Sequence, residues 1–213
     1  MSAAHSHGNS WAFELMGGRL SLDFTNTVSG MRVVAPVERL NSYADLVSWG
    51  RQVGALDAAQ ARRLLAEAER DAGAAARALA EAIAFREALF RAFRAVAENG
   101  APTAEDLDSL NRVLSRARAR ERLVCRGGRC ALGWPGDDAS LDRMLWPVAR
   151  SAAEVLTSAE VSRVRICEAT ATDGCGWLFL DETRNRSRRW CSMKDCGNRA
   201  KARRHYRRRR AGG

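Results

Sequence analysis

The chain has 213 residues, and its hydrophobic content of 46% excludes a wholly disordered protein and allows one or two small domains. No apolar run approaches the roughly 18 residues that a membrane-spanning helix needs. The net charge of +10 lies at one end: residues 1–162 hold 20 Lys and Arg against 20 Asp and Glu, whereas residues 163–213 hold 15 against 5. Such a localised basic segment is typical of a protein that binds nucleic acid or an anionic membrane surface.

The first 160 residues predict a mostly helical domain with two short β segments. Residues 20–24 alternate apolar and polar side chains, which predicts a short strand. Gly127 and Gly128 lie between two short apolar stretches and predict a hairpin. Thr103, with Asp106 three residues later, predicts a capped helix start. Helices are expected over residues 41–56, 57–71, 74–100, 102–121 and 140–158.

The cysteines of the basic segment have the spacing of a metal site. The first 18 residues lack the basic and apolar regions of a secretory signal, so we expect a cytoplasmic protein with reduced thiols. Four cysteines follow the pattern C-x7-C-x15-C-x4-C, and structural zinc sites use four thiolates in a tetrahedron, usually as two close pairs. We therefore predict one structural Zn²⁺ bound by Cys167, Cys175, Cys191 and Cys196.

The sequence around these cysteines predicts how they meet. Residues 177–181 and 187–191 are expected to form a hairpin, which would place Cys175 beside Cys191. Ser192 and Asp195 have the spacing of a helix cap, so a helix is expected to begin near Met193. The arrangement resembles a treble-clef-like zinc finger. A unit of about 45 residues cannot bury enough apolar surface alone, and a metal supplies the missing stability.

Other uses of these side chains stay open on the sequence. Two disulfides are disfavoured by the reducing compartment. A catalytic zinc needs an open coordination position and usually His or carboxylate ligands, for which Glu168, Asp173 and His205 are near enough in sequence. Cys125 and Cys130 flank the Gly-Gly turn, and we expect packed thiols there. The alternatives for this pair are redox activity or replacement of the widely spaced first zinc pair.

The predicted C-terminal helix carries most of the basic charge. Arg199, Arg203 and Arg207 are four residues apart and therefore lie on one face. An arginine run is by default a solvated face or a disordered tail, but this run is attached to a predicted metal site. We predict contacts to nucleic acid by Arg186, Arg188, Arg189, Asn198, Arg199, Lys201, Arg203, Arg204, Arg207 and Arg208.

Two further interpretations concern aromatic and short polar residues. Trp177, Trp190 and Tyr206 could stack on unpaired bases, so RNA stays open beside DNA, although tryptophans in so small a unit are more often core. Asp23 and Asn26 could line a ligand pocket beside the expected strand. The simpler interpretation is that Asp23 faces water and Asn26 turns the chain.

The motif Cys196-Gly197-Asn198-Arg199 lies in a stretch, residues 175–206, that resembles the CGNR zinc-finger family. The upstream stretches LSLDFTNT, LNSYADLVSW, FREALFRAF and PVARSAAEVLTS are similar to the ABATE domain that accompanies this finger. The resemblance implies a bacterial, stress-linked transcription regulator whose finger binds DNA and whose helical domain senses a small ligand. It also implies zinc ligands at Cys175, Cys191 and Cys196 with Cys167 as the fourth, although the first pair is wider here than in the family.

Taken together, these patterns predict an α+β chain that is mainly helical. We expect an ABATE-like helical domain at residues 1–160, a CGNR-type zinc finger at residues 163–208 and a flexible tail at residues 209–213. The expected function is zinc-dependent DNA binding in transcription regulation, without enzymatic activity and without a membrane. The alternatives are an RNA-binding module, or a small-molecule sensor or enzyme in the helical domain, with Asp23 and Asn26 at its site and the finger as a docking element. A homodimer is a further expectation, because dimers are common among regulators.

Overall fold

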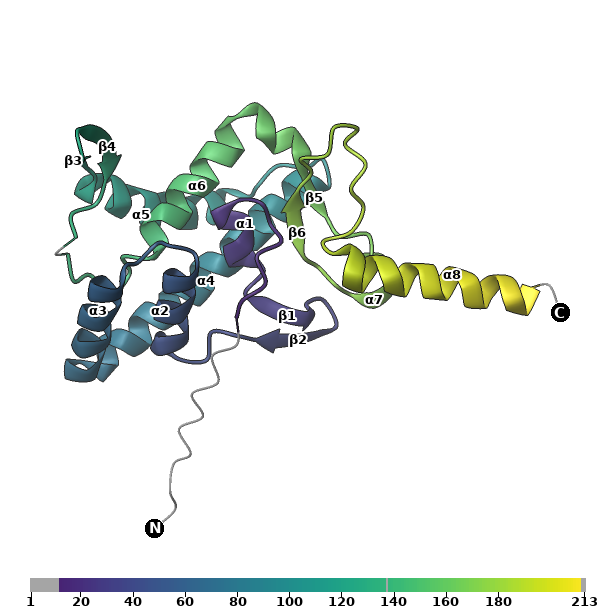
Figure 1. The fold of residues 1–213 in the computed structure, drawn as a ribbon, viewed down its shortest axis with the longest axis horizontal. Helices are drawn as coiled ribbons and strands as arrows, with labels where there is room; N and C mark the ends of the chain where they lie inside the picture. Colours follow the sequence, from purple (N-terminus) through teal and green to yellow (C-terminus); the bar gives the residue numbers. More distant parts are fainter. Residues whose placement is uncertain (1–11, 137, 212–213) are drawn as a thin grey trace, which may run out of the picture.

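The computed structural model describes residues 12–136 and 138–211, most of them helical (Figure 1). The helices are α1 (Leu20–Thr25), α2 (Tyr43–Gln52), α3 (Ala58–Arg70), α4 (Ala72–Ala97), α5 (Ala104–Arg120), α6 (Leu145–Thr157), α7 (Thr170–Asp173) and α8 (Asn198–Ala211), with a 3-10 turn η1 (Ala159–Arg163) and a π turn η2 (Met193–Gly197). The strands are β1 (Val28–Met31), β2 (Ala35–Glu38), β3 (Arg122–Arg126), β4 (Arg129–Gly133), β5 (Val164–Ile166) and β6 (Leu178–Leu180). They form three separate antiparallel pairs, β1–β2, β3–β4 and β5–β6. The predicted class, α+β and mainly helical, is confirmed.

Helix starts follow local capping signals. Ser42 and Asp57 each accept a hydrogen bond from the backbone N–H three residues on, and the side chain at that position bonds back, so α2 and α3 both begin with a capping box. Thr103 caps α5 through the forward bond alone: its hydroxyl accepts from the Asp106 N–H at 3.2 Å and donates to the Asp106 carboxylate at 3.0 Å. No helix in the described ranges is both long and apolar enough to cross a bilayer.

The core centres on α1 and α4 and extends into the C-terminal segment. α1 packs against α4, α6 and β6. Phe24 of α1 is fully buried, and the centroid of its ring lies 4.8 Å from the centroid of the Trp49 ring. Val164 of β5 and Leu178 and Leu180 of β6 belong to the same buried cluster as these residues. The basic segment is therefore joined to the helical part through a shared apolar core.

The strand predicted over residues 20–24 is wrong, because this segment is the short helix α1. Three apolar residues in alternation are too few to distinguish a strand from one and a half helical turns. In the helix Leu22 and Phe24 are buried, as are the polar residues Ser21 and Thr25. The Thr25 hydroxyl donates to the Leu22 carbonyl at 2.7 Å, so a buried polar group is satisfied within the helix itself.

The predicted pairing of residues 177–181 with 187–191 is also wrong. β6 pairs instead with β5, in the register Val164↔Leu180 to Ile166↔Leu178. All three residues of β6 are buried, so a partner strand with apolar side chains suits it better than the arginine-rich residues 187–191. The chain still returns to β6, because Asp181 accepts hydrogen bonds from the Thr183 and Arg188 backbone N–H groups at 2.9 and 3.0 Å.

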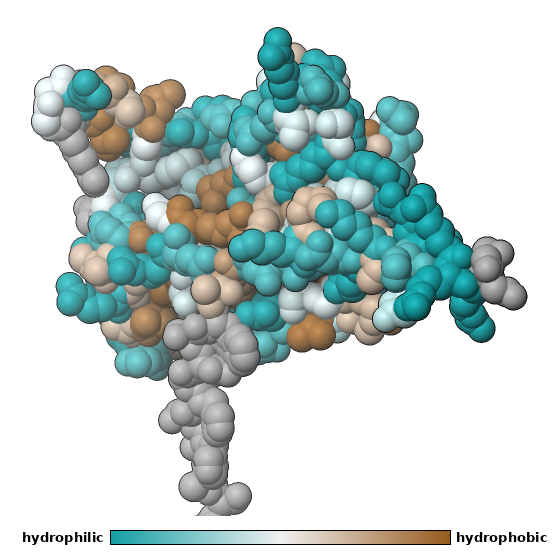
Figure 2. Space-filling view, turned by 45° about the vertical axis from the view of Figure 1, so that its right-hand side comes forward, coloured by the Kyte–Doolittle hydropathy of each residue, from teal (hydrophilic) through white to brown (hydrophobic). Residues whose placement is uncertain are grey.

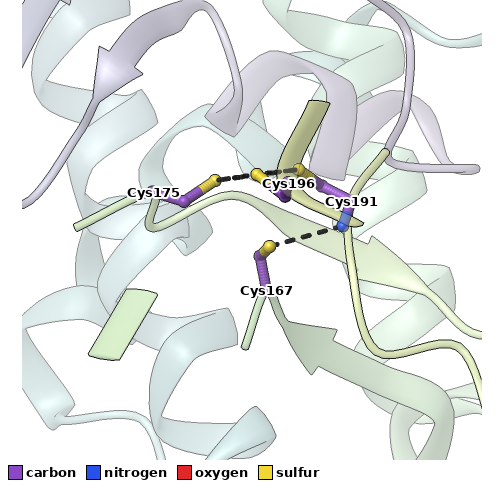
Figure 3. A group of neighbouring side chains, drawn as sticks. All are labelled: Cys167, Cys175, Cys191 and Cys196. Carbon is purple, nitrogen blue, oxygen red and sulfur yellow. Dashed lines mark hydrogen bonds between the residues drawn. The ribbon is translucent and has the colours of Figure 1, made fainter. Parts of the chain in front are cut away.

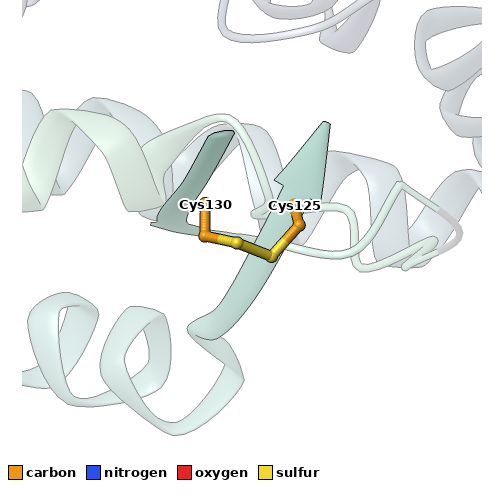
Figure 4. Close-up of a disulfide and its surroundings, with 2 residues drawn as sticks. All are labelled: Cys125 and Cys130. Carbon is orange, nitrogen blue, oxygen red and sulfur yellow. A yellow bond between two sulfur atoms is a disulfide. The ribbon is translucent and has the colours of Figure 1, made fainter. Parts of the chain in front are cut away.

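The predicted hairpin at Gly127-Gly128 is confirmed as β3–β4, but packed thiols at Cys125 and Cys130 are a wrong prediction. The two cysteines are directly opposite in the strand register and form a disulfide (Figure 4). The Cβ atoms of directly opposed residues in an antiparallel pair are close enough for a disulfide to bridge them.

The flexible tail at residues 209–213 stays a prediction, and residues 209–211 continue the last helix. α8 is helical through Ala211, and residues 212–213 lie outside the described range. Arginine has a high helix propensity, and positive charge in the last turn interacts favourably with the helix dipole.

Asn26 links the segment after α1 to β6 through its side chain. Its side-chain amide donates to the Leu178 carbonyl at 2.8 Å, and its side-chain oxygen accepts from the Leu178 backbone N–H at 3.1 Å. Both groups are buried, so Asn26 satisfies the edge of β6 that β5 leaves unpaired.

Substitution Asn26→Ala should lower the free energy of unfolding by about 2–4 kcal/mol, because it leaves a buried N–H and a buried C=O of Leu178 without partners. Chemical denaturation of the zinc-loaded chain measures the change. Asn41→Ala is the matched control, since the Asn41 amide is exposed and makes its bond to Glu38 at the surface. Equal effects of the two substitutions would contradict this role of Asn26.

Candidate metal centre and nucleic-acid interface

Four cysteines from separate segments meet beside β6 (Figure 3). Cys167 follows β5, Cys175 follows α7, Cys191 ends the loop after β6, and Cys196 lies in η2. Their exposures are between 0% and 4%, and their sulfur atoms lie within 4.8 Å of one another. Among the described residues no other His, Cys, Asp or Glu forms such a group.

The sulfur positions fit a tetrahedral zinc. Zn–S bonds of about 2.3 Å imply edges of about 3.8 Å between the sulfur atoms of a tetrahedron. The Sγ atoms of Cys175, Cys191 and Cys196 are 3.7, 3.6 and 3.6 Å apart, so they form one face of such a tetrahedron. Cys167 lies opposite this face and accepts the Cys191 backbone N–H at 3.4 Å.

Four buried thiols cannot all ionise without a cation. Hydrogen bonds from Cys175, Cys191 and Cys196 lower the pKa of Cys167. The hydrogen bond to Cys167 raises the pKa of both Cys175 and Cys191, so one thiolate forms at the expense of its neighbours. A divalent metal removes this competition, because it stabilises all of the thiolates together.

Two glycines shape the chain around Cys175. Gly174 ends α7 at φ 68°, and Gly176 has φ 73°, both in the left-handed region that favours glycine. The loop between β1 and β2 covers them: the Arg32 N–H donates to the Cys175 carbonyl at 3.2 Å and the Val33 N–H to the Gly174 carbonyl at 2.9 Å. A Cβ at Gly174 would approach Val34 to 2.6 Å, so this N-terminal loop fits the metal site closely.

The first two arginines of α8 contact the metal site and α7, although the side chain of Arg199 is still 53% exposed. Arg199 donates to the Cys196 sulfur at 3.1 Å and lies 3.4 Å from Asp173, and its positive charge offsets part of the negative charge of four thiolates. Arg203 is ion-paired with Asp173 and donates to the Thr172 hydroxyl at 2.9 Å. These contacts dock the start of α8 onto α7.

Two more predicted nucleic-acid residues have partners within the chain. Arg188 donates to the backbone carbonyls of Met16, Trp190 and Cys191 at 2.9, 3.1 and 2.6 Å, and its guanidinium lies over the Phe179 ring at 4.2 Å. Arg189 donates to Glu168 at 2.6 Å. Arg188 is thus a structural residue that closes the loop between β6 and Cys191.

The remaining predicted residues are exposed. Asn198 donates to the Lys194 carbonyl at 2.9 Å near the helix start. The side chains of the other five make no hydrogen bond or ion pair with any residue in the described ranges, and these unpaired cations are Arg186, Lys201, Arg204, Arg207 and Arg208. α8 extends away from the body (Figure 1), and in the space-filling view it is a continuous hydrophilic arm (Figure 2).

The alternative zinc ligands lie outside the cysteine cluster. Glu168 is engaged by Arg189, and Asp173 by Arg199 and Arg203. His205 lies on the exposed part of α8, beside the Tyr206 ring. Trp177 is 7% exposed and donates its indole N–H to the Val28 carbonyl at 2.8 Å, so it is core rather than a base-stacking surface.

Asp23 and Asn26 have structural partners. Asp23 accepts the Gly17 N–H at 2.7 Å and is partly buried rather than facing water, and desolvation raises its pKa to about 6 against the opposing hydrogen bonds of Gly17 and Met16. Asn26 uses its amide on Leu178. These contacts lend no support to a ligand site at the pair, and that role stays a prediction.

Comparison with known families agrees with this geometry. Residues 18–159 match the ABATE family, described as "Putative stress-induced transcription regulator", and residues 163–209 match the CGNR zinc finger. No protein with a curated description matches the chain. The finger match and the four buried cysteines within ligand distance identify a site for a single structural zinc.

Substitution Arg199→Ala should weaken zinc binding by about 10–100-fold, because it removes the cation that contacts the Cys196 sulfur. Competition with a chelator measures this affinity on the full chain. Lys201→Ala is the control: it removes the same charge two residues later from a side chain without partners, and zinc affinity should not change. Equal zinc affinities for the two variants would refute the role assigned to Arg199.

Proposed function

Because the chain belongs to the ABATE family and ends in a CGNR zinc finger, we propose that it is a DNA-binding transcription regulator. In this proposal one Zn²⁺ is bound by Cys167, Cys175, Cys191 and Cys196 and organises the docking of α8. The exposed face of α8 then contacts DNA phosphates. The supporting observation is that α8 carries eight Lys and Arg and no Asp or Glu, and that its outer cations have no partner among the described residues.

The zinc in this proposal has a structural role. Four thiolates complete a tetrahedron and leave no position for water or a substrate, which is what a catalytic zinc needs. The small cluster around the site contains Phe179 and Trp177 besides the cysteines, which is too little apolar surface to hold the loops after β6 without the metal. When bound, zinc supplies the cross-link between β5, α7 and the start of α8.

The contact with DNA rests on charge that the chain itself does not neutralise. α8 is polar on all sides, and a surface helix without an apolar face gains little from packing. Eight like charges on 14 residues repel one another, so a polyanion that lies along the helix stabilises it. The arginine fork also suits phosphate and guanine edges.

A groove beside α8 supports RNA as the second candidate partner. A cavity of about 240 Å³ is lined by Arg204 and Arg207 of α8 and by Trp190, which is only partly buried. A cationic groove with an aromatic wall suits an unpaired base next to a phosphate. Duplex DNA remains the preferred partner because the description of the ABATE family is that of a transcription regulator.

A ligand-sensing function of the helical part also has one observation in its favour. A cavity of about 560 Å³ lies between the β1–β2 loop and α4 and is lined in part by Arg32, Arg86 and Phe90. The same loop hydrogen-bonds to the Cys175 backbone, so a ligand in this cavity would contact an element that touches the zinc site. A ligand that raises the melting temperature of the intact chain but not of an Arg32→Ala variant would support this ligand-sensing function.

The zinc ligands can be tested one by one. The intact chain should hold one zinc, and Cys167→Ser should abolish retention of zinc during dialysis against a chelator, because the tetrahedron loses one thiolate. Cys125→Ser, purified under reducing conditions, is the control and should retain one zinc. Elemental analysis gives the stoichiometry, and full retention by the Cys167 variant would remove this residue from the ligand set.

The DNA interface predicts a specific change in salt dependence. The triple substitution of Arg204, Arg207 and Arg208 by Ala should weaken duplex DNA binding and reduce the slope of log K against log salt by about 2.7, because each lost phosphate contact contributes about 0.9. Titration by fluorescence anisotropy at several salt concentrations measures both. The control replaces three exposed arginines of the helical part, Arg51, Arg62 and Arg112, and removes the same charge.

Three outcomes would overturn the proposal. They are equal effects of the two triple substitutions, an affinity for DNA that is independent of salt, and stronger binding of single-stranded RNA than of duplex DNA. The last result would favour the RNA-binding function instead.

A further inference from the structure

The β3–β4 hairpin carries the two cysteines that the zinc site does not use. Cys125 and Cys130 face each other across the strands and are both exposed, whereas the four zinc-site cysteines are at most 4% exposed. Exposure decides which sulfur atoms small thiols and oxidants can reach. Among the described residues, Cys125 and Cys130 are therefore the cysteines that small thiols and oxidants can reach.

The hairpin depends on few other contacts. Both strands belong to neither buried cluster, and the hairpin stands out from the body beyond α5 and α6 (Figures 1 and 2). Leu123 and Leu132, which are directly opposite and on the same face as the cysteines, are 69% and 55% exposed. An isolated two-stranded hairpin is marginally stable in water, so the bond between the cysteines is a main constraint on its tip.

The base of the hairpin is anchored separately. The Trp134 indole N–H donates to the Ala117 carbonyl at 2.8 Å, and Arg150 donates to the Leu132 carbonyl at 3.2 Å and to Glu121 at 3.0 Å. These contacts do not involve the sulfur atoms. Loss of the disulfide would therefore loosen the tip without releasing the base.

We propose that Cys125 and Cys130 are a reversible redox modification site whose oxidation state sets the order of the β3–β4 tip. The oxidant is a low-molecular-weight disulfide. The Cys125 or Cys130 thiolate attacks it, forms a mixed disulfide and releases one small thiolate. The second cysteine then attacks the mixed disulfide, which forms the Cys125–Cys130 bond and releases the second small thiolate.

The two exchanges conserve atoms, electrons and protons. Two electrons pass from the cysteine pair to the small disulfide, and the two protons of the cysteine thiols go to the two released thiolates. A small dithiol reverses both steps. The product is the state with the cross-strand bond (Figure 4), and the reduced state has two exposed thiols on a hairpin without its cross-link.

The test uses the full zinc-loaded chain in buffers with a graded ratio of reduced to oxidised glutathione. After an acid quench and alkylation, mass spectrometry counts the free thiols at each cysteine. We expect Cys125 and Cys130 to change together and reversibly across this range, while the zinc content stays at one per chain. A disulfide that persists at every ratio, thiols that never pair, or changes confined to the zinc cysteines would each overturn the proposal.

Limited trypsin digestion tests the structural consequence, because cleavage can follow Arg126 and Arg129 at the tip. Reduction should speed cleavage there several-fold, since proteolysis tracks local opening. The double variant Cys125→Ser/Cys130→Ser should be cleaved at the reduced rate under both conditions. Cleavage at one rate in the oxidised, reduced and double-variant chains would contradict control of the tip by the disulfide.

Discussion

The C-terminal part of this chain depends on one constraint: four buried thiolates repel one another unless a cation binds between them. Cys167, Cys175, Cys191 and Cys196 come from four segments with little regular structure between them, and their sulfur atoms lie within 4.8 Å. Only a cation allows all four to be thiolates, and its binding energy then holds the segments together. The position of α8 follows, because Cys196 lies in the turn that starts it.

The same negative charge explains how the basic residues divide. Arg199 contacts the Cys196 sulfur and Asp173, and Arg203 is ion-paired with Asp173, so both have partners within the chain. The unpaired cations of α8 are Lys201, between these two arginines, and the cations that follow Arg203. The basic residues of α8 therefore divide into arginines that contact the metal site and α7, and cations whose side chains have no partner among the described residues.

Sequence reasoning predicted the parts of the structure that depend on nearby residues. The capping pairs at Thr103 and Ser192, the Gly-Gly hairpin and the cysteine set needed only local spacing. The pairing of β6 with β5 could not be predicted in this way, because burial by α1 and α4 selects the partner of an apolar strand. The partners of Arg188 were hidden for the same reason: Met16 is distant in sequence, and no local pattern marks a carbonyl as an acceptor.

The shared core also sets an order of assembly during synthesis. Leu22 and Phe24 of α1 pack in one cluster with Leu178 and Leu180, so the apolar surface of α1 that α4 and α6 leave open is covered only after about 180 residues have been made. The metal site is completed later still, by Cys196. A ribosome-bound chain must therefore keep α1 partly uncovered for most of its synthesis, and a chain truncated before β6 would expose that surface to chaperones and proteases.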